Sequence, residues 1–265
     1  MATTPKTRAP ADRGVIPTPA RRQGELGTRG HSVFLIGEVL LAALVAALAA
    51  TVKSHPGPLP GDVGTTLDVQ HALLPHQALT ALVDSVSTIN WPQPSAVALV
   101  VVVLVLLVLR RWLDALCGVL TAVLGDLSSY LLNGIVQRPR PDGYGVHVLS
   151  HITNYFSFPS GHVVHAFAFF GFLLFLSFRS WGLSAARIHS SHLWSWALWA
   201  IRAVLIVLIV LMGPSRVLEG EHWPSDVVGG ALTGAFWLVL GAHLYLWAQK
   251  RWPRLRHGPG GGQRA

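Results

Sequence analysis

Six apolar segments, separated by polar stretches with turn-forming Gly and Pro, constrain the fold of this chain more than any other feature. Most of them approach the length that a helix needs to cross the hydrocarbon core of a bilayer, which is about 20 residues. Only 12% of the residues are charged, about half of what a soluble domain carries. The sequence therefore predicts an all-α bundle of six transmembrane helices, at residues 33–52, 96–109, 113–136, 163–178, 196–212 and 227–247.

The polar segments divide the rest of the chain. Residues 1–31 are rich in Pro, Gly, Thr and Arg and are predicted to form a disordered tail. The six-span domain then occupies residues 32–249, and a basic, Gly-rich tail follows at 250–265. A long connection, residues 53–94, joins the first two spans. Within it the amphipathic stretch Ala72–Val86 favours a helix that lies at the membrane interface.

Basic residues are distributed unevenly between the two sides of the predicted bundle. Six spans place both termini on one side, and that side carries 15 of the 20 Lys and Arg residues, against 4 on the other. The positive-inside rule therefore predicts a plasma-membrane protein with both termini in the cytoplasm. The net charge of +8 is then explained by topology and by contacts with anionic membrane lipids, and binding of nucleic acid is not expected.

Three short motifs stand at span ends on the opposite side, which is predicted to be extracytoplasmic. They gather arginines, histidines and one carboxylate, a set that suits phosphate-ester chemistry without a metal or another cofactor. No metal-ligand spacing of the zinc-protease kind is present. The motifs are Arg138-Pro139-Arg140-Pro141, Pro159-Ser160-Gly161-His162, and Ser215-Arg216 followed by His222 and Asp226.

The second motif leads directly into a span, so it is predicted to form an anion site at a helix N-terminus. Ser160 is a favourable N-cap, and Gly161 lets the backbone approach a ligand closely. His162 would lie beside the anion, placed to protonate a leaving oxygen. Arg140 and Arg216 present planar guanidinium groups, which grip phosphate oxygens in pairs.

In the third motif, Asp226 follows His222 by four residues at the start of the last span. That spacing lets the carboxylate accept a hydrogen bond from one imidazole nitrogen, which leaves the other as an oriented, neutral nucleophile. The predicted reaction is covalent catalysis. His222 attacks phosphorus, a phosphohistidine forms, and water hydrolyses it.

Taken together, the motifs resemble those of the type 2 phosphatidic acid phosphatase superfamily of lipid phosphate phosphatases. The family pattern is Lys, six residues, Arg-Pro; then Pro-Ser-Gly-His; then Ser-Arg, five residues, His, three residues, Asp. The last two motifs match at every defined position, and the resemblance covers about residues 113–248. It implies that His222 is the nucleophile, Asp226 its orienting acid and His162 the general acid, with phosphate ligands at Arg140, Arg216, Ser160 and Gly161.

The resemblance also implies a substrate class, a lipid phosphate or diphosphate. Undecaprenyl diphosphate, phosphatidic acid and phosphatidylglycerol phosphate are the candidates. An extracytoplasmic site favours recycling of a polyprenyl diphosphate carrier. The oligomeric state is not indicated by the sequence.

The first motif departs from the family pattern, because Asn133 stands where the family has Lys. Asn133 is the expected phosphate ligand at this position, but an amide donates a hydrogen bond without bringing charge. The missing charge would lower the rate roughly ten- to thousandfold, unless Arg138 compensates. Two alternatives therefore stay open. One is a lipid phosphotransferase that uses the same histidine, and the other is a catalytically weakened lipid-binding homologue.

Several other polar residues in the spans and loops have simpler interpretations. Asp126 shares a helix face with Asn133, and a packing or hydrogen-bonding role is expected for it. His165, one turn beyond His162, is expected to be structural. His147 and His151 fall in a polar loop and are predicted to be solvated. Cys117, the one cysteine, is predicted to be a buried thiol. None of these residues is expected to take part in the reaction.

Overall fold

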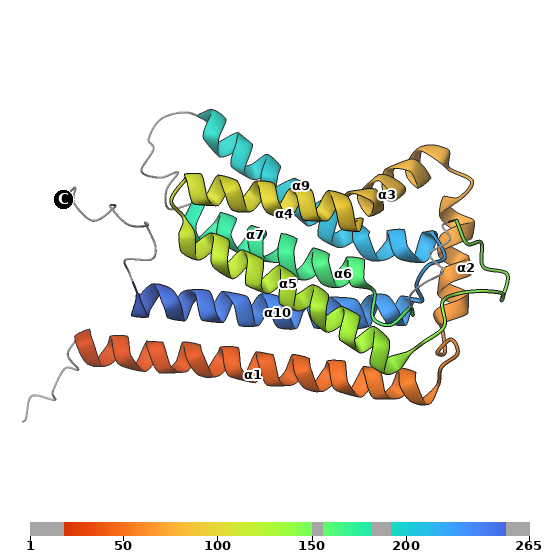
Figure 1. Ribbon diagram of the computed structural model, residues 1–265, viewed down its shortest axis with the longest axis horizontal. Coiled ribbons are helices and arrows are strands. Elements are labelled where there is room, and N and C mark those ends of the chain that lie inside the picture. Colours follow the sequence, from red (N-terminus) through yellow and green to blue (C-terminus); the bar gives the residue numbers. More distant parts are fainter. Residues whose placement is uncertain (1–18, 150–155, 182–191, 253–265) are drawn as a thin grey trace, which may run out of the picture.

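The computed structural model describes residues 19–149, 156–181 and 192–252, and the regular elements within these ranges are all helices. The long helices run side by side, and the beginning of α1 lies at the same end of the bundle as the end of α10 (Figure 1). One helical run, residues 161–181, alternates α and π geometry. The elements are α1 (Pro19–Ser54), α2 (Asp62–Leu73), α3 (Gln77–Ile89), α4 (Pro92–Val108), α5 (Trp112–Val136), α6 (Gly161–His165), η1 (Ala166–Phe170), α7 (Gly171–Leu176), η2 (Ser177–Trp181), α9 (His192–Leu218) and α10 (Pro224–Arg251).

Within these ranges, five helical segments are long and apolar enough to cross a membrane, which confirms the predicted all-α membrane bundle. A sixth candidate span is bent, because α3 and α4 meet at an angle of 61°. The expected second span, 96–109, corresponds to α4. The five segments are Gly30–Ser54, Trp112–Val136, Gly161–Arg179, Trp194–Leu218 and Pro224–Arg251.

The connection between the first two spans forms two helices, so the single helix predicted at Ala72–Val86 is wrong. α2 ends at Leu73 and α3 begins at Gln77. Pro75 lies between them, and proline cannot donate the backbone hydrogen bond that a continuous helix needs. Both helices pack against α9, which places the connection over one end of the bundle (Figure 1).

α1 begins earlier than its apolar pattern predicts. It starts at Pro19, so the prediction of a disordered segment up to residue 31 is wrong for residues 19–31. Arg, Gln, Glu and Leu in this stretch have high helix propensity, which lets the helix extend beyond its apolar part. The rest of that tail, residues 1–18, lies outside the described residues, as do His151 and the end of the C-terminal tail.

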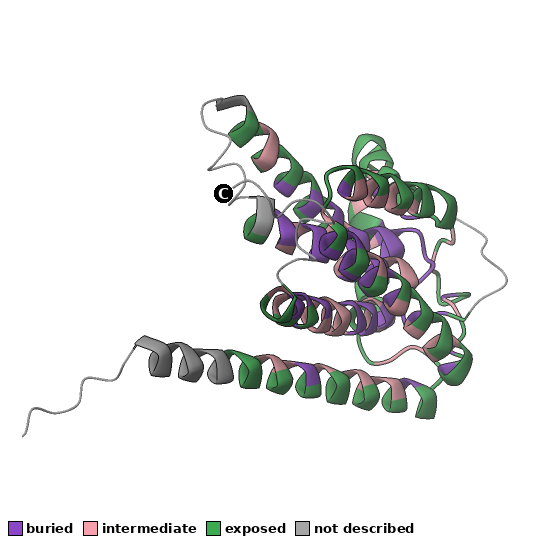
Figure 2. Ribbon diagram, turned by 60° about the vertical axis from the view of Figure 1, so that its left-hand side comes forward, coloured by how far each residue is buried: buried purple, intermediate pink, exposed green. Residues whose placement is uncertain are grey.

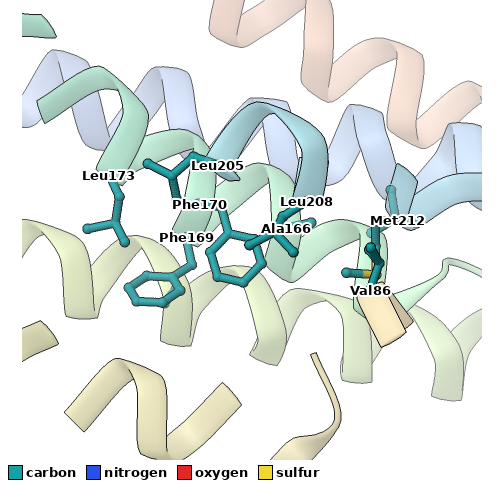
Figure 3. Packing of buried hydrophobic residues seen from close by; sticks show 10 residues of the cluster. Val86, Ala166, Phe169, Phe170, Leu173, Leu205, Leu208 and Met212 are labelled. Atoms are coloured by element: carbon teal, nitrogen blue, oxygen red, sulfur yellow. The ribbon is translucent and has the colours of Figure 1, made fainter. Parts of the chain in front are cut away.

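The main apolar core joins the run from α6 to α7 with α9 and α3. Phe169, Phe170 and Leu173 pack with Leu205 and Leu208 of α9 (Figure 3). Burial is concentrated in these inner helices, whereas most of the side chains described in α1 are exposed (Figure 2). Lipid tails are as apolar as these side chains, so close packing rather than the hydrophobic effect stabilises such a core within a membrane.

Glycines of α10 let this helix approach α6 closely. A Cβ atom added at Gly230 would lie 2.7 Å from the carbonyl oxygen of Ser160, and one added at Gly234 would lie 2.6 Å from that of Val164. The amide of Ser160 donates to the carbonyl oxygen of Asp226 at 3.1 Å. This contact brings the second and third motifs together at the mouth of the bundle.

Candidate active site

The three motifs meet at the end of the bundle where α5 and α9 finish and α6 and α10 begin (Figure 1). A pocket of about 620 Å³ opens among them, called the site pocket below. Its polar lining includes Asn133, Arg140, Gly161, His162, Glu221 and His222. Its apolar lining includes Trp91, Pro92, Ala96 and Leu99 near the start of α4, with Tyr130 and Phe156.

His222 lies in the turn between α9 and α10, and its ring is held by a backbone carbonyl. Its Nδ1 lies 2.7 Å from the carbonyl oxygen of Ser157, which fixes the proton on Nδ1 because a carbonyl can only accept. Nε2 therefore carries the lone pair, and it lies 3.5 Å from Nη1 of Arg140. Burial lowers the pKa of His222 to about 4, which keeps the imidazole neutral near pH 7.

Asp226 is fully buried in the first turn of α10, but its nearest charged partner is an arginine. Its Oδ2 lies 3.8 Å from Nδ1 of His222, beyond hydrogen-bonding distance. Its Oδ1 lies 2.5 Å from Nη1 of Arg138, and its Oδ2 accepts from the amide of Trp223 at 2.9 Å. In this structure the imidazole thus donates its hydrogen bond to the carbonyl oxygen of Ser157, and Asp226 contributes a negative charge nearby.

Arg138 extends the charged network into the connection between the first two spans. It is fully buried, and its Nη2 donates to Asp62 Oδ2 at 2.8 Å and to the carbonyl oxygen of Gly57 at 3.0 Å. Asp62 in turn accepts from the amide of Ser225 at 3.0 Å. Arg138 is therefore committed to Asp62 and Asp226, and it does not replace the missing family lysine in the site pocket.

The two arginines expected to hold phosphate lie on either side of Glu221. Nη1 of Arg216 is 2.9 Å from Oε2 of Glu221, and Nη1 of Arg140 is 3.7 Å from the same oxygen. Arg216 is fully buried behind the pocket wall and also binds Glu219 and Ser87. Burial raises the pKa of the Glu221 carboxyl, although both arginines oppose this shift. Burial likewise lowers the pKa of Arg140.

The second motif begins α6, with Ser160 as its N-cap residue. Oγ of Ser160 and Nε2 of His162 are buried without a hydrogen-bond partner among the described residues. Asn90 at the end of α3 donates to the carbonyl oxygen of His162 at 2.7 Å and supports the turn. Unpartnered buried polar atoms at a helix N-terminus are the groups that a bound anion would satisfy.

Asn133 lines the site pocket, but its donor group is engaged within the protein. Nδ2 donates to the carbonyl oxygen of Pro159 at 3.1 Å, while Oδ1 is buried without a partner among the described residues. The residue therefore supports the loop that carries the second motif. A lysine here would bring its charge to the same edge of the pocket.

Sequence reasoning missed five residues that complete the site. Glu219 and Glu221 are two of the five residues between Arg216 and His222 that the third motif leaves undefined, and their only signal in the sequence was their acidic charge near an arginine. Ser157 acts through its backbone, which no side-chain pattern reveals. Asp62 and Asn90 stand at helix ends in the connection, far from the motifs in sequence. Across residues 19–149, 156–181 and 192–252, no group of three His, Cys, Asp or Glu side chains is arranged to hold a metal ion.

The chain is similar to known proteins in sequence and in fold. A sequence model of the PAP2 superfamily matches residues 111–252. Lipid A 1-phosphatases from Rhizobium etli and Rhizobium johnstonii are each 30% identical to the chain over 133 residues, which is 47% of this chain and 47% and 45% of those proteins. The chain thus spans about half the length of the curated relatives it matches.

The fold also matches a solved structure, that of the transmembrane PAP2-type phosphatidylglycerolphosphate phosphatase from Bacillus subtilis. The TM-score is 0.60 at 23% sequence identity, and the match covers 78% of this chain and 94% of that one. At this identity the likeness concerns the fold alone. It extends beyond residues 111–252 and so includes part of the N-terminal half.

Proposed function

Because this chain belongs to the PAP2 superfamily and forms a multi-pass membrane bundle, we propose that it is a phosphatase that hydrolyses a lipid phosphate or diphosphate. One observation carries the proposal. His222 lines a pocket with Nδ1 held by a carbonyl, so that its lone pair at Nε2 stands beside Arg140. A neutral, oriented imidazole next to a guanidinium is the arrangement that nucleophilic attack on phosphorus requires.

In the first step, Nε2 of His222 forms a bond to phosphorus while the bond from phosphorus to the lipid oxygen breaks. Arg140 neutralises charge on the equatorial oxygens, together with the backbone amides at the start of α6. His162, which enters this step protonated beside the bound phosphate anion, gives a proton from Nε2 to the leaving lipid oxygen; this atom has no partner among the described residues. The imidazolium character that His222 gains is stabilised by the nearby Asp226 carboxylate.

In the second step, water attacks the phosphohistidine. His162, now neutral, takes a proton from that water, and the bond between phosphorus and Nε2 breaks. Inorganic phosphate leaves, and both histidines return to their starting states. Arg216 lies behind Arg140 and Glu221, and we assign it an electrostatic role through Glu221 rather than direct contact.

A lipid substrate is favoured by the lining of the site pocket. The polar groups lie where the helices end, and the apolar groups Trp91, Ala96 and Leu99 lie beside them near the start of α4. A phosphate at the polar end would leave a hydrocarbon chain against this apolar wall. The relatives named above are lipid A 1-phosphatases, whose substrate also carries a phosphate on a lipid.

The test is phosphate release by the detergent-purified protein from undecaprenyl diphosphate, phosphatidic acid and phosphatidylglycerol phosphate, with a chelator present. We expect release by the wild type and none by His222→Ala. A rapid alkaline quench with labelled substrate should trap a phosphoprotein in the wild type, and this label should be stable in base and lost in acid. Equal release by His222→Ala, or no release by folded wild-type protein, would overturn the proposal. Appearance of a phosphorylated acceptor in place of phosphate would assign phosphotransfer instead.

We further propose that the site faces the extracytoplasmic side, because the opposite end of the bundle carries most of the basic residues. Single cysteines at Asp142 and Arg251, both exposed, report the two ends. In a Cys117→Ala background, a membrane-impermeant maleimide should label Asp142→Cys in intact cells and Arg251→Cys only after lysis. The reverse pattern would contradict this orientation.

A further inference from the structure

A second histidine–carboxylate pair lines the site pocket and takes no part in the chemistry described above. Nδ1 of His165 lies 2.9 Å and 3.1 Å from the two carboxylate oxygens of Asp126. His165 is only 6% exposed, and its Nε2 is buried without a partner among the described residues. The Asp126 side chain is 48% exposed. Both residues line the site pocket.

The pair lies one helical turn deeper in the bundle than the phosphate site. His165 follows His162 by three residues in α6, which corresponds to about 4.5 Å along a helix axis. Asp126 lies in α5, two turns before Asn133. The atoms of a lipid next to its phosphate ester would occupy this depth, before its hydrocarbon chains begin.

The chemistry of the pair is that of a hydrogen-bond acceptor. A carboxylate can only accept, so Nδ1 of His165 donates its proton to Asp126. Oxygens of Asp126 retain further accepting capacity. Placing hydrocarbon against such a pair would leave polar groups unsatisfied, which costs free energy. A hydroxyl or an N–H group would instead satisfy it.

We propose that Asp126 and His165 form a headgroup site that selects lipids with a hydroxyl or N–H donor close to the phosphate. This inference rests on the proposed phosphatase function and names its substrate class. A glycerol unit with a free hydroxyl, or an amide-bearing sugar, supplies such a donor. Diacylglycerol phosphate supplies only ester acceptors, and a prenyl diphosphate places hydrocarbon next to its phosphates. The structure thus favours a different class from the polyprenyl carrier that sidedness alone suggests.

A purely structural role gives a different expectation. If the pair only joins α5 to α6, its loss should weaken the fold and reduce activity on every substrate by the same factor. If the pair binds headgroups, its loss should change the ratio between substrates. The ratio is therefore the decisive quantity.

The experiment compares kcat/KM for phosphatidylglycerol phosphate, lipid A, phosphatidic acid and undecaprenyl diphosphate. The variants are Asp126→Leu, His165→Leu and the matched control Asp84→Leu, an exposed residue of α3 outside the site pocket. The wild type is expected to prefer one of the two donor-bearing lipids. Asp126→Leu should lower kcat/KM for that lipid about ten- to hundredfold relative to the two donor-free lipids, the effect of losing a hydrogen bond to a charged group.

Which donor-bearing lipid responds distinguishes a glycerol from a sugar headgroup. A preference for donor-free lipids in the wild type, or an equal loss on all four lipids in Asp126→Leu, would overturn the inference. Lipid binding to the His222→Ala protein separates this result from failure of the phosphatase proposal. In that background the preference for the donor-bearing lipid should persist without hydrolysis and disappear in Asp126→Leu.

Discussion

Replacing Arg138 with Met removes the guanidinium that two buried carboxylates share. Arg138 is fully buried, and Asp62 and Asp226 are 3% and 0% exposed. Breaking a buried ion pair by removing one partner costs about 3–5 kcal/mol, because the remaining charge is left uncompensated. Here one substitution strands two carboxylates, so Arg138→Met should lose at least that amount, a factor of about 10² to 10⁴ in the ratio of folded to unfolded protein.

The same geometry predicts that a second substitution, Asp62→Asn, partly restores the stability lost in Arg138→Met. In Arg138→Met with Asp62→Asn, only Asp226 stays uncompensated, and it still accepts from the amide of Trp223. The double variant should therefore be more stable than Arg138→Met alone, even though Asp62→Asn is destabilising in the wild type. Such non-additivity is the signature of residues that share one network.

The assay is reversible unfolding in mixed detergent micelles with increasing SDS, followed by the fluorescence of the ten tryptophans. The matched control is Arg251→Met at the exposed end of α10, which should stay within about 0.5 kcal/mol of the wild type. A loss of less than about 1 kcal/mol in Arg138→Met, or a double variant that falls by the sum of the two single losses, would refute the reasoning.

Three further predictions concern the site and its scaffold. Glu221→Gln should strengthen inhibition by orthovanadate roughly tenfold, because it removes a carboxylate that competes for Arg140; unchanged inhibition would contradict this. The pKa of His222 is lowered to about 4 from 6.5, so the unfolded protein binds more protons between these values and stability should decrease as the pH is lowered through this window; the slope should be shallower in His222→Ala. Gly234→Ala should lower the thermal midpoint by several degrees through its clash with α6, whereas Gly134→Ala, whose Cβ meets nothing described within 4 Å, should leave it unchanged or slightly higher.

The helical spans and the three motifs could be predicted from the sequence because each is a local pattern. The length of the apolar segment predicted the start of α5 within one residue of the observed position. The motifs predicted that His162, His222 and Arg140 share one site, and all three line the site pocket. Pro75 could have divided the helix predicted in the connection, since proline interrupts helices by a local rule.

The rest of the site depends on pairings between distant segments. Asp62 accepts hydrogen bonds from Arg138 and Ser225, which lie 76 and 163 residues away in the sequence. No local sequence pattern predicts contacts between residues so far apart. The spacing of His222 and Asp226 permits a hydrogen bond, but Arg138 competes for the same carboxylate and holds it at 2.5 Å. Which partner prevails is decided by tertiary packing.

The orientation of His222 depends on a main-chain oxygen, that of Ser157. No side-chain substitution deletes a peptide carbonyl, so alanine scanning would register only the hydroxyl of Ser157, which donates to the carbonyl oxygen of Pro139 at 3.1 Å. Selection that preserves the nucleophile would therefore act on the length and path of the chain between Arg140 and Ser157. Among related sequences, insertions and deletions in that interval should be rarer than amino-acid changes at position 157.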